Sequence, residues 1–323
     1  MRIRFLILLF FYSLLQVNGQ QLPDWSGFYE VAFTHNPALT ARWSRAETSI
    51  IHRMDYSGIQ GAPQTTTLSF QLPFIRPVTQ SGIGAFLTHD EVGPAKTYTF
   101  QATYNYRIRP QLFGYSNDCL AFGLGAGIKS FQFNPNNEIA FDGLAVDPNL
   151  IPQKANFNPD ISMGIFYSTT RDLYEFESHY YFGIAMHKFI PVSDDLGVLG
   201  KLSNNTQVMI HGGYRILPFR STYYIEPQLF LSYGWYKTVH AMAACRVEWE
   251  NLLWLGAGIG SNRNYYGQIG FIFDGQSKLK FLVSDGALRL GLKVNNYGNY
   301  FGKFTGLGGE LYAAYTFDMD LYQ

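Results

Sequence analysis

Residues 96–109 alternate between apolar and polar side chains at nearly every position. Odd positions are polar, whereas the even positions from 98 onward are apolar or aromatic: Tyr98, Phe100, Ala102, Tyr104, Tyr106 and Ile108. Successive side chains of a strand point to opposite faces, so this stretch predicts a strand with one apolar and one polar face. At about 13 residues it exceeds the roughly 5–6 of a usual soluble strand and can span a bilayer at a tilt of about 45°. A long edge strand of a soluble β-sandwich is the alternative for this stretch alone.

The same alternation recurs along the chain and predicts about 14 strands, an even number as bacterial outer-membrane barrels require. The predicted strands are Thr48–Met54, Thr65–Leu72, Gly82–Asp90, Lys96–Arg109, Cys119–Phe131, Ile161–Tyr167, His179–His187, Thr206–Ile216, Tyr223–Trp235, His240–Trp249, Leu253–Ile259, Tyr265–Phe273, Ala287–Val294 and Glu310–Phe317. With a periplasmic amino terminus, the connections outside the cell include the long segments 132–160, 188–205 and 295–309. The periplasmic turns include the short 217–222 and 250–252, with 110–118, 168–178 and 274–286 as longer exceptions.

Long external connections and short periplasmic ones are typical of outer-membrane barrels. The sequence therefore predicts an all-β protein, an antiparallel transmembrane β-barrel over residues 48–323 in the bacterial outer membrane. Composition agrees: the chain has 32 Gly, 23 Tyr and 27 Phe, and its 15% charged residues are fewer than the usual figure of about 25%. No apolar run after the amino terminus approaches the roughly 20 residues of a membrane helix. The chain carries 24 basic and 24 acidic side chains, which gives no indication of a nucleic-acid partner.

The amino terminus predicts a secretory signal peptide over residues 1–19. Arg2 and Arg4 precede the apolar core Phe5–Leu15, and small residues follow at positions 17–19. Residues 20–47 lack clean alternation but contain the aromatic residues Trp25, Phe28, Tyr29 and Phe33, followed by Asn36, Pro37 and Ala38. We expect an ordered periplasmic segment whose aromatic side chains pack against the barrel. Together with the turn at residues 53–65, it would narrow or close the lumen. A disordered tail is the alternative.

Few motifs in the sequence indicate catalysis, cofactor binding or metal binding. Residues 123–130 superficially resemble a phosphate loop, but they lack adjacent Gly-Lys and lie within a strand, so no nucleotide cofactor is expected. Glycines on the inward face of this strand would instead relieve crowding and permit bending, or let an internal segment approach the wall. His179, His187 and His211 face inward, yet no local signature marks a nucleophile beside them, and we expect them to fill the lumen through hydrogen bonds. Neither CxxC nor paired-His spacing surrounds Cys119 and Cys245, which are predicted to be packing residues, so no metal site is expected.

The turn at residues 53–65 has the most specific sequence in the chain, Arg-Met-Asp-Tyr-Ser-Gly-Ile-Gln-Gly-Ala-Pro-Gln-Thr. Apolar Ile59 and Ala62 lie among Gly58, Gly61 and Pro63, a composition that suits a loop folded inward against the barrel wall. An ordinary external hairpin loop, or a purely structural latch, is the alternative.

These motifs resemble the PorP/SprF family of outer-membrane components of the type IX secretion system. The matching positions of the turn are Arg53, Gly58, Ile59, Gly61, Ala62, Pro63 and Thr65, with Tyr56 where the family usually has Trp. Further matches are Asn36-Pro37-Ala38, Gly82-Ile83-Gly84, Val92-Gly93-Pro94 and the segment 104–108, whereas Gly308-Gly309-Glu310 lacks the His of the family pattern.

The resemblance implies a protein that is not an enzyme. Family members act in the secretion or surface attachment of cargo proteins, through a carboxy-terminal signal of the cargo. They also contact periplasmic components of the apparatus, and in the gliding-motility branch the cargo is a large adhesin. We predict that partners bind at the 53–65 turn. The candidate residues of the amino-terminal segment, which we expect to pack against the barrel, are Trp25, Phe28, Tyr29, Phe33, Asn36 and Pro37. A channel for small or hydrophobic solutes, similar to plugged fatty-acid transporters, is the second hypothesis, and a barrel hydrolase is the third.

Overall fold

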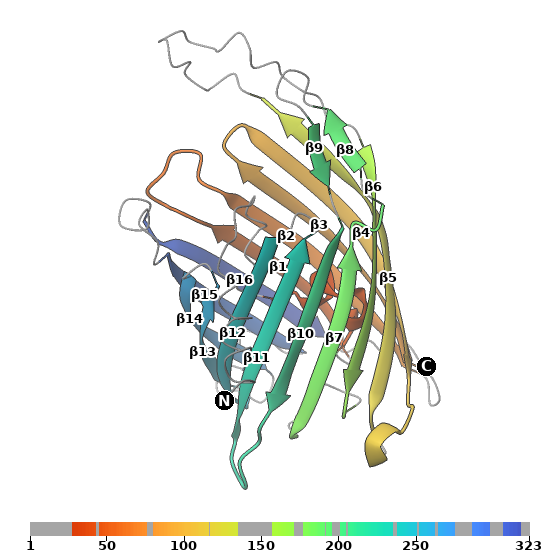
Figure 1. Cartoon of the computed structure of the whole chain (residues 1–323). Coiled ribbons are helices and arrows are strands. Elements are labelled where there is room, and N and C mark those ends of the chain that lie inside the picture. The colour runs from red at the N-terminus through yellow and green to blue at the C-terminus, as the bar shows by residue number, and fades with distance from the viewer. Residues whose placement is uncertain are drawn as a thin grey trace, which may run out of the picture.

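The computed structural model describes residues 28–42, 45–75, 80–115, 117–134, 157–170, 177–190, 192–195, 201–204, 206–234, 238–250, 252–261, 264–274, 286–297 and 306–317. The predicted signal peptide and Trp25 lie outside these residues. Within them, fourteen antiparallel strands close into a barrel (Figure 1). No helix in this part of the chain is long and apolar enough to cross a membrane.

The barrel strands follow one another around the wall in chain order. They are β1 (Ala46–Met54), β2 (Gln64–Ile75), β3 (Gln80–Val92), β4 (Ala95–Ile108), β5 (Cys119–Phe133), β6 (Phe157–Ser168), β7 (His179–His187), β10 (Gln207–Arg215), β11 (Tyr223–Gly234), β12 (Thr238–Trp249), β13 (Leu253–Gly260), β14 (Asn264–Asp274), β15 (Ala287–Tyr297) and β16 (Gly308–Phe317). The seam closes between β1 and β16, where Ile50 lies opposite Ala313 and Arg53 opposite Glu310. Each predicted strand is present, so the predicted fold class is confirmed.

A short hairpin, β8 (Val192–Asp195) and β9 (Lys201–Asn204), interrupts the connection between β7 and β10. The sequence analysis placed these residues in one long loop, because strands of four residues are too short to show a period of two. Figure 1 shows the hairpin beyond the barrel rim, at the top. The turn 55–63, the turn 93–94 and this hairpin lie at the same end of the antiparallel barrel. We assign that end to the cell exterior, because longer connections are external in such barrels.

The two faces of β4 are those predicted. Phe100, Ala102 and Tyr104 are exposed on the outer face, whereas Gln101 and Thr103 are buried on the lumen face. This register follows directly from the alternation, because a shift by one residue would turn every aromatic side chain into the polar interior.

Residues 28–42 lie inside the barrel, and we call them the plug. They contain the short helix α2 (Ala32–His35) and the 3-10 turn η1 (Pro37–Leu39), drawn in red within the barrel in Figure 1. Nearly every residue of the plug is buried. Phe33 packs edge-on against Phe86 of β3, with ring centroids 5.7 Å apart, and Phe28 packs against Phe230 of β11 at 5.3 Å.

The register predicts a difference between two neighbouring substitutions on β4. Ala102→Arg would place a guanidinium in lipid, which costs about 2–4 kcal/mol near the bilayer midplane. Thr103→Arg would instead displace Thr40 of the plug, since the hydroxyl groups of Thr40 and Thr103 lie 2.8 Å apart. We expect Ala102→Arg to lower the amount of heat-modifiable barrel in outer-membrane fractions far more than Thr103→Arg. Equal assembly, or the reverse order, would contradict the register.

Candidate functional site

The plug rests on a strip of inward-facing glycines. A Cβ atom added to Gly123 of β5 would overlap the backbone of Pro37 and Ala38, and one added to Gly164 of β6 would overlap the side chain of Asn36. At Gly84 of β3 it would lie 2.9 Å from Cγ2 of Thr40. The expectation that inward glycines let an internal segment approach the wall is therefore confirmed.

Asn36 is the central anchor of the plug and is fully buried. Its Oδ1 accepts a hydrogen bond from the Ala38 backbone N–H at 3.0 Å and so caps η1, as Asn does at a helix start. Its Nδ2 donates to the Ile165 carbonyl at 3.2 Å and lies 3.0 Å from Nε2 of His211. Because the capping bond fixes which amide atom is oxygen, His211 Nε2 accepts from Asn36, and this imidazole nitrogen carries no proton.

Wall side chains also bind the plug backbone directly. Asn105 Nδ2 donates to the Ala38 carbonyl at 3.0 Å, and the Ala41 N–H donates to Gln71 at 2.7 Å. An Arg107 nitrogen donates to the Thr40 carbonyl at 2.8 Å. These bonds matter because buried backbone groups without partners would cost about 1–3 kcal/mol each.

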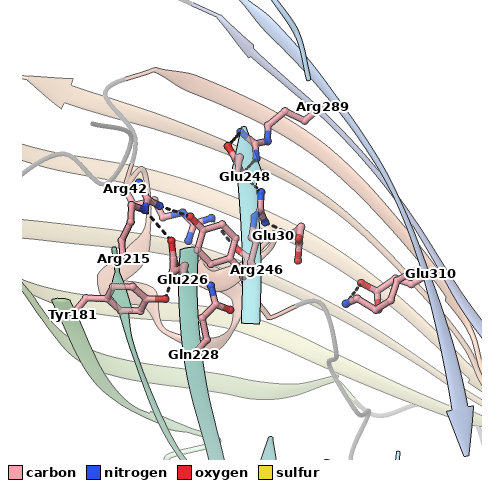
Figure 2. Close-up of polar contacts among 12 residues, drawn as sticks. Glu30, Arg42, Tyr181, Arg215, Glu226, Gln228, Arg246, Glu248, Arg289 and Glu310 are labelled. Atoms are coloured by element: carbon pink, nitrogen blue, oxygen red, sulfur yellow. Dashed lines mark hydrogen bonds and ion pairs between the residues drawn. The ribbon is translucent and has the colours of Figure 1, made fainter. Parts of the chain in front are cut away.

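Ion pairs connect the plug to the opposite wall, where Figure 2 shows Glu30 beside Arg246 of β12, with Glu248 and Arg289 next to them. Glu30 pairs with Arg246 at 3.1 Å. Glu248 pairs with Arg246 and, at 2.9 Å, with Arg289 of β15. Opposite charges therefore alternate from Glu30 of the plug to side chains on two wall strands, β12 and β15.

A second group surrounds Glu226 of β11. Its carboxylate pairs with Arg215 of β10 at 2.8 Å and accepts hydrogen bonds from Tyr181 and Gln228, each at 2.8 Å (Figure 2). Arg215 also donates to the Tyr29 hydroxyl at 2.8 Å. Three further hydrogen bonds thus satisfy this buried ion pair, the condition under which such pairs are tolerated.

Sequence reasoning did not select these charged residues as a site. The sequence did offer one indication, because ionisable residues at membrane depth carry a high free-energy cost and usually mark a functional site. The inward histidines are hydrogen-bonded as expected, since His187 contacts the His35 carbonyl and His211 contacts Asn36. Cys119 is a buried packing residue, whereas Cys245 is exposed on the outer face, so the packing role predicted for Cys245 is wrong.

The 53–65 turn is tied to its neighbours at the external rim. Arg53 pairs with Asp55 at 2.9 Å, and Asp55 accepts a hydrogen bond from Tyr297. The Tyr56 ring packs on that of Tyr297, with centroids 4.2 Å apart. Further bonds join Ser57 N–H to the Leu307 carbonyl at 3.1 Å, Gly93 N–H to the Gly61 carbonyl at 2.9 Å and Thr65 to Asp90 at 2.6 Å. Three external turns are therefore held together.

The tip of this turn differs from the expected inward fold. Ala62 is buried and Gly61 has a positive φ of 73°, as the composition suggested. Ile59, however, is 47% exposed, because the bonds from Ile59 N–H to Tyr56 and from Ala62 N–H to Ile59 close tight turns that place it at the tip. The turn contacts β3, β15 and the residue before β16, whereas Phe33, Thr40 and Asn36 contact wall residues from β3 to β10. The turn and the plug therefore share β3 and otherwise contact different strands.

The structure defines an outer-membrane β-barrel with an occupied lumen. It resembles a CymD monoaromatic hydrocarbon channel (TM-score 0.54, 10% identity, 90% of this chain and 93% of that chain) and a Pseudomonas aeruginosa FadL homologue (TM-score 0.51, 11% identity, 90% and 94%). The family described as type IX secretion system membrane protein PorP/SprF matches residues 17–319, so the chain belongs to the PorP/SprF family of type IX secretion. A search of curated proteins finds no match.

His35 gives the plug a predicted pH dependence. Burial, and then the nearby His187 and His211, lower the pKa of His35 from 6.5 to about 3. Arg42 on the plug, Asp160 on β6 and Lys188 after β7 are the other charged groups near these imidazoles. A released plug would bind a proton below pH 6.5 and a docked plug would not, so docking is full above pH 6.5 and weakens as pH falls toward 3. The loss is about 1.4 kcal/mol per pH unit in that window.

The measurement is single-channel conductance in planar bilayers between pH 7 and pH 4.5. We expect open events to become more frequent on acidification, and His35→Gln to flatten this dependence. A pH profile that is the same for wild type and His35→Gln would contradict the assignment.

Proposed function

We propose that this protein is a non-enzymatic outer-membrane component of type IX secretion that binds cargo through an adhesin-type carboxy-terminal signal and contacts periplasmic partners of the same apparatus. The occupied lumen is the observation that supports this best. A passive porin keeps a water-filled lumen, whereas here glycines, hydrogen bonds and ion pairs from opposite walls fix the plug. Such a barrel suits the binding of a partner better than free diffusion.

We place cargo recognition on the 53–65 turn. Arg53, Tyr56 and Thr65 hold its base, and Ala62 and Pro63 lie against the rim. Gly58, Ile59 and Gly61 form its exposed surface. Binding residues are commonly found on loops that a rigid scaffold positions. A purely structural latch explains the contacts at the base but not the exposed apolar side chain at the tip.

Substitution of Ile59 tests this site. Ile59 is exposed at the tip of the turn, so Ile59→Asp should leave heat-modifiable barrel in the membrane. We expect the variant to lower surface display of the cognate cargo by about tenfold or more, equivalent to about 1.4 kcal/mol of binding free energy. Cell-surface labelling followed by quantitative mass spectrometry measures the display.

Gln60→Asp is the matched control, because it adds the same charge at the next exposed position. Normal display by Ile59→Asp would remove cargo recognition from the turn. Gly61→Val tests the latch separately, since it strains a residue with φ of 73° beside Gly93. If Gly61→Val alone fails to assemble, the turn has a structural role as well.

A channel for small or hydrophobic solutes is the second candidate. It is favoured by a small cavity between plug and wall that Phe28, Leu39 and Phe166 partly line. Uptake of a hydrophobic solute by cells that contain or lack the protein distinguishes the two functions. If the protein is a channel, cells that lack it should take up less of the solute and display the same amount of cargo. If it acts in secretion, cells that lack it should take up the same amount of solute and display less cargo.

A further inference from the structure

Tyr29 and Glu30 of the plug occupy an arginine-lined site on the lumen wall. The Tyr29 ring contacts two guanidinium groups, with its centroid 4.6 Å from Cζ of Arg246 on the wall and 4.4 Å from Cζ of Arg42 of the plug itself. Its hydroxyl accepts from Arg215 at 2.8 Å. The Glu30 carboxylate pairs with Arg246 at 3.1 Å. An aromatic ring and the next carboxylate thus fill one site through cation–π and charge-assisted contacts.

Within this network of ion pairs, the wall contributes more cationic than anionic side chains. Among the described residues, these ion pairs join three wall arginines to two wall glutamates, and Glu30 of the plug supplies the third carboxylate. Nε of Arg246 is buried and has no hydrogen-bond partner in the described part of the chain, so the site retains a spare donor. A buried cation that loses its partner is costly, which means that this wall requires an anion.

The site lies at the periplasmic end of the lumen. Arg215 is the last residue of β10, Arg246 lies near the periplasmic end of β12, and Arg289 is the third residue of β15. All three positions are at the end opposite the 53–65 turn. A ligand would therefore reach the site from the periplasm.

We propose that this site is a receptor for an aromatic–acidic segment of a periplasmic polypeptide, and that Tyr29 and Glu30 are an internal mimic that this segment displaces. The inference rests on the proposed secretion function and names the peptide chemistry that opens the plug. A tethered mimic competes at an effective concentration in the millimolar range. A free peptide therefore binds weakly until the mimic is weakened or a second contact adds affinity.

The test uses purified full-length protein in nanodiscs and a fluorescent ten-residue peptide that carries Tyr-Glu, with a Tyr-Gln peptide for comparison. Fluorescence anisotropy measures Kd for wild type, for Glu30→Gln, for Tyr29→Ala/Glu30→Gln and for the latter with Arg246→Gln. We expect Tyr29→Ala/Glu30→Gln to bind the Tyr-Glu peptide about tenfold or more tightly than wild type, with Glu30→Gln intermediate. The Tyr-Gln peptide, or addition of Arg246→Gln, should abolish this gain.

Heat-modifiable migration confirms that each variant is assembled, and Glu30→Gln serves if the double variant does not assemble. The inference would be overturned if all variants bound the peptide with the same Kd, or if the Tyr-Glu and Tyr-Gln peptides bound equally tightly. Full competition by millimolar acetate would also overturn it, because it would show that the site binds small anions only. Ile59→Asp separates the two proposals, because it should bind the peptide like wild type while it loses cargo display. If Tyr29→Ala/Glu30→Gln does not bind the Tyr-Glu peptide while Ile59→Asp still loses cargo display, this inference is overturned and the proposed secretion function stands.

Discussion

Gly123→Val should release the plug from the barrel wall and leave the barrel assembled. A side chain at this position overlaps the backbone of Pro37 and Ala38, which cannot move aside while Asn36 and Asn105 hold them. The strand itself should tolerate the change, because Val favours β-structure. We expect single-channel conductance to change from a closed level in wild type to large, stable openings.

Gly267→Val is the control, since a Cβ at Gly267, on the outer face of β14, meets nothing within 4 Å. Deletion of residues 20–33 should reproduce the opening without any change to the wall. A closed Gly123→Val barrel would contradict the role of the glycine strip. A wild-type protein that conducts like an open porin would contradict the plug.

Glu226→Gln should destabilise the barrel by about 3–5 kcal/mol, the usual cost of removing one partner of a buried ion pair. Glu226 is fully buried, and the substitution removes the carboxylate charge that pairs with Arg215 at 2.8 Å. Urea-induced unfolding in phospholipid vesicles, followed by tryptophan fluorescence, measures the difference.

Glu91→Gln provides the matched comparison. Glu91 pairs with Lys96 at 3.1 Å, but both side chains are well exposed, so the same substitution should cost about 1 kcal/mol or less. Similar losses of stability in the two variants would show that the buried charges are not coupled as the ion pairs indicate.

The barrel could be predicted because apolar and polar side chains alternate along each strand, a pattern that can be read from neighbouring residues alone. In β4 the alternation alone assigns Ala102 to lipid and Thr103 to the lumen, and glycines at alternate positions of β5 indicate a close internal neighbour. Hairpin β8–β9 was missed because four residues do not establish a period.

The site was predictable only in part, because its contacts join distant parts of the chain. Asn36 bonds to Ile165, which is 129 residues away, and Glu30 pairs with Arg246, 216 residues away. No local pattern encodes which strand meets the plug. Composition identified the aromatic and Asn-Pro residues of the plug, but the register of the closed barrel decides their partners. Ile59 shows the reverse error: its apolar character suggested burial, whereas the hydrogen bonds of the tight turn place it at the exposed tip.

The most direct test of the secretion function is recovery of partners from the native membrane. The full-length protein, cross-linked in living cells of its own bacterium, is affinity-purified and its companions are identified by mass spectrometry. An unrelated outer-membrane barrel, purified in parallel, gives the background. The account predicts enrichment of a secreted protein with a carboxy-terminal secretion signal, together with periplasmic type IX components. Recovery of only those proteins that also accompany the unrelated barrel would contradict it.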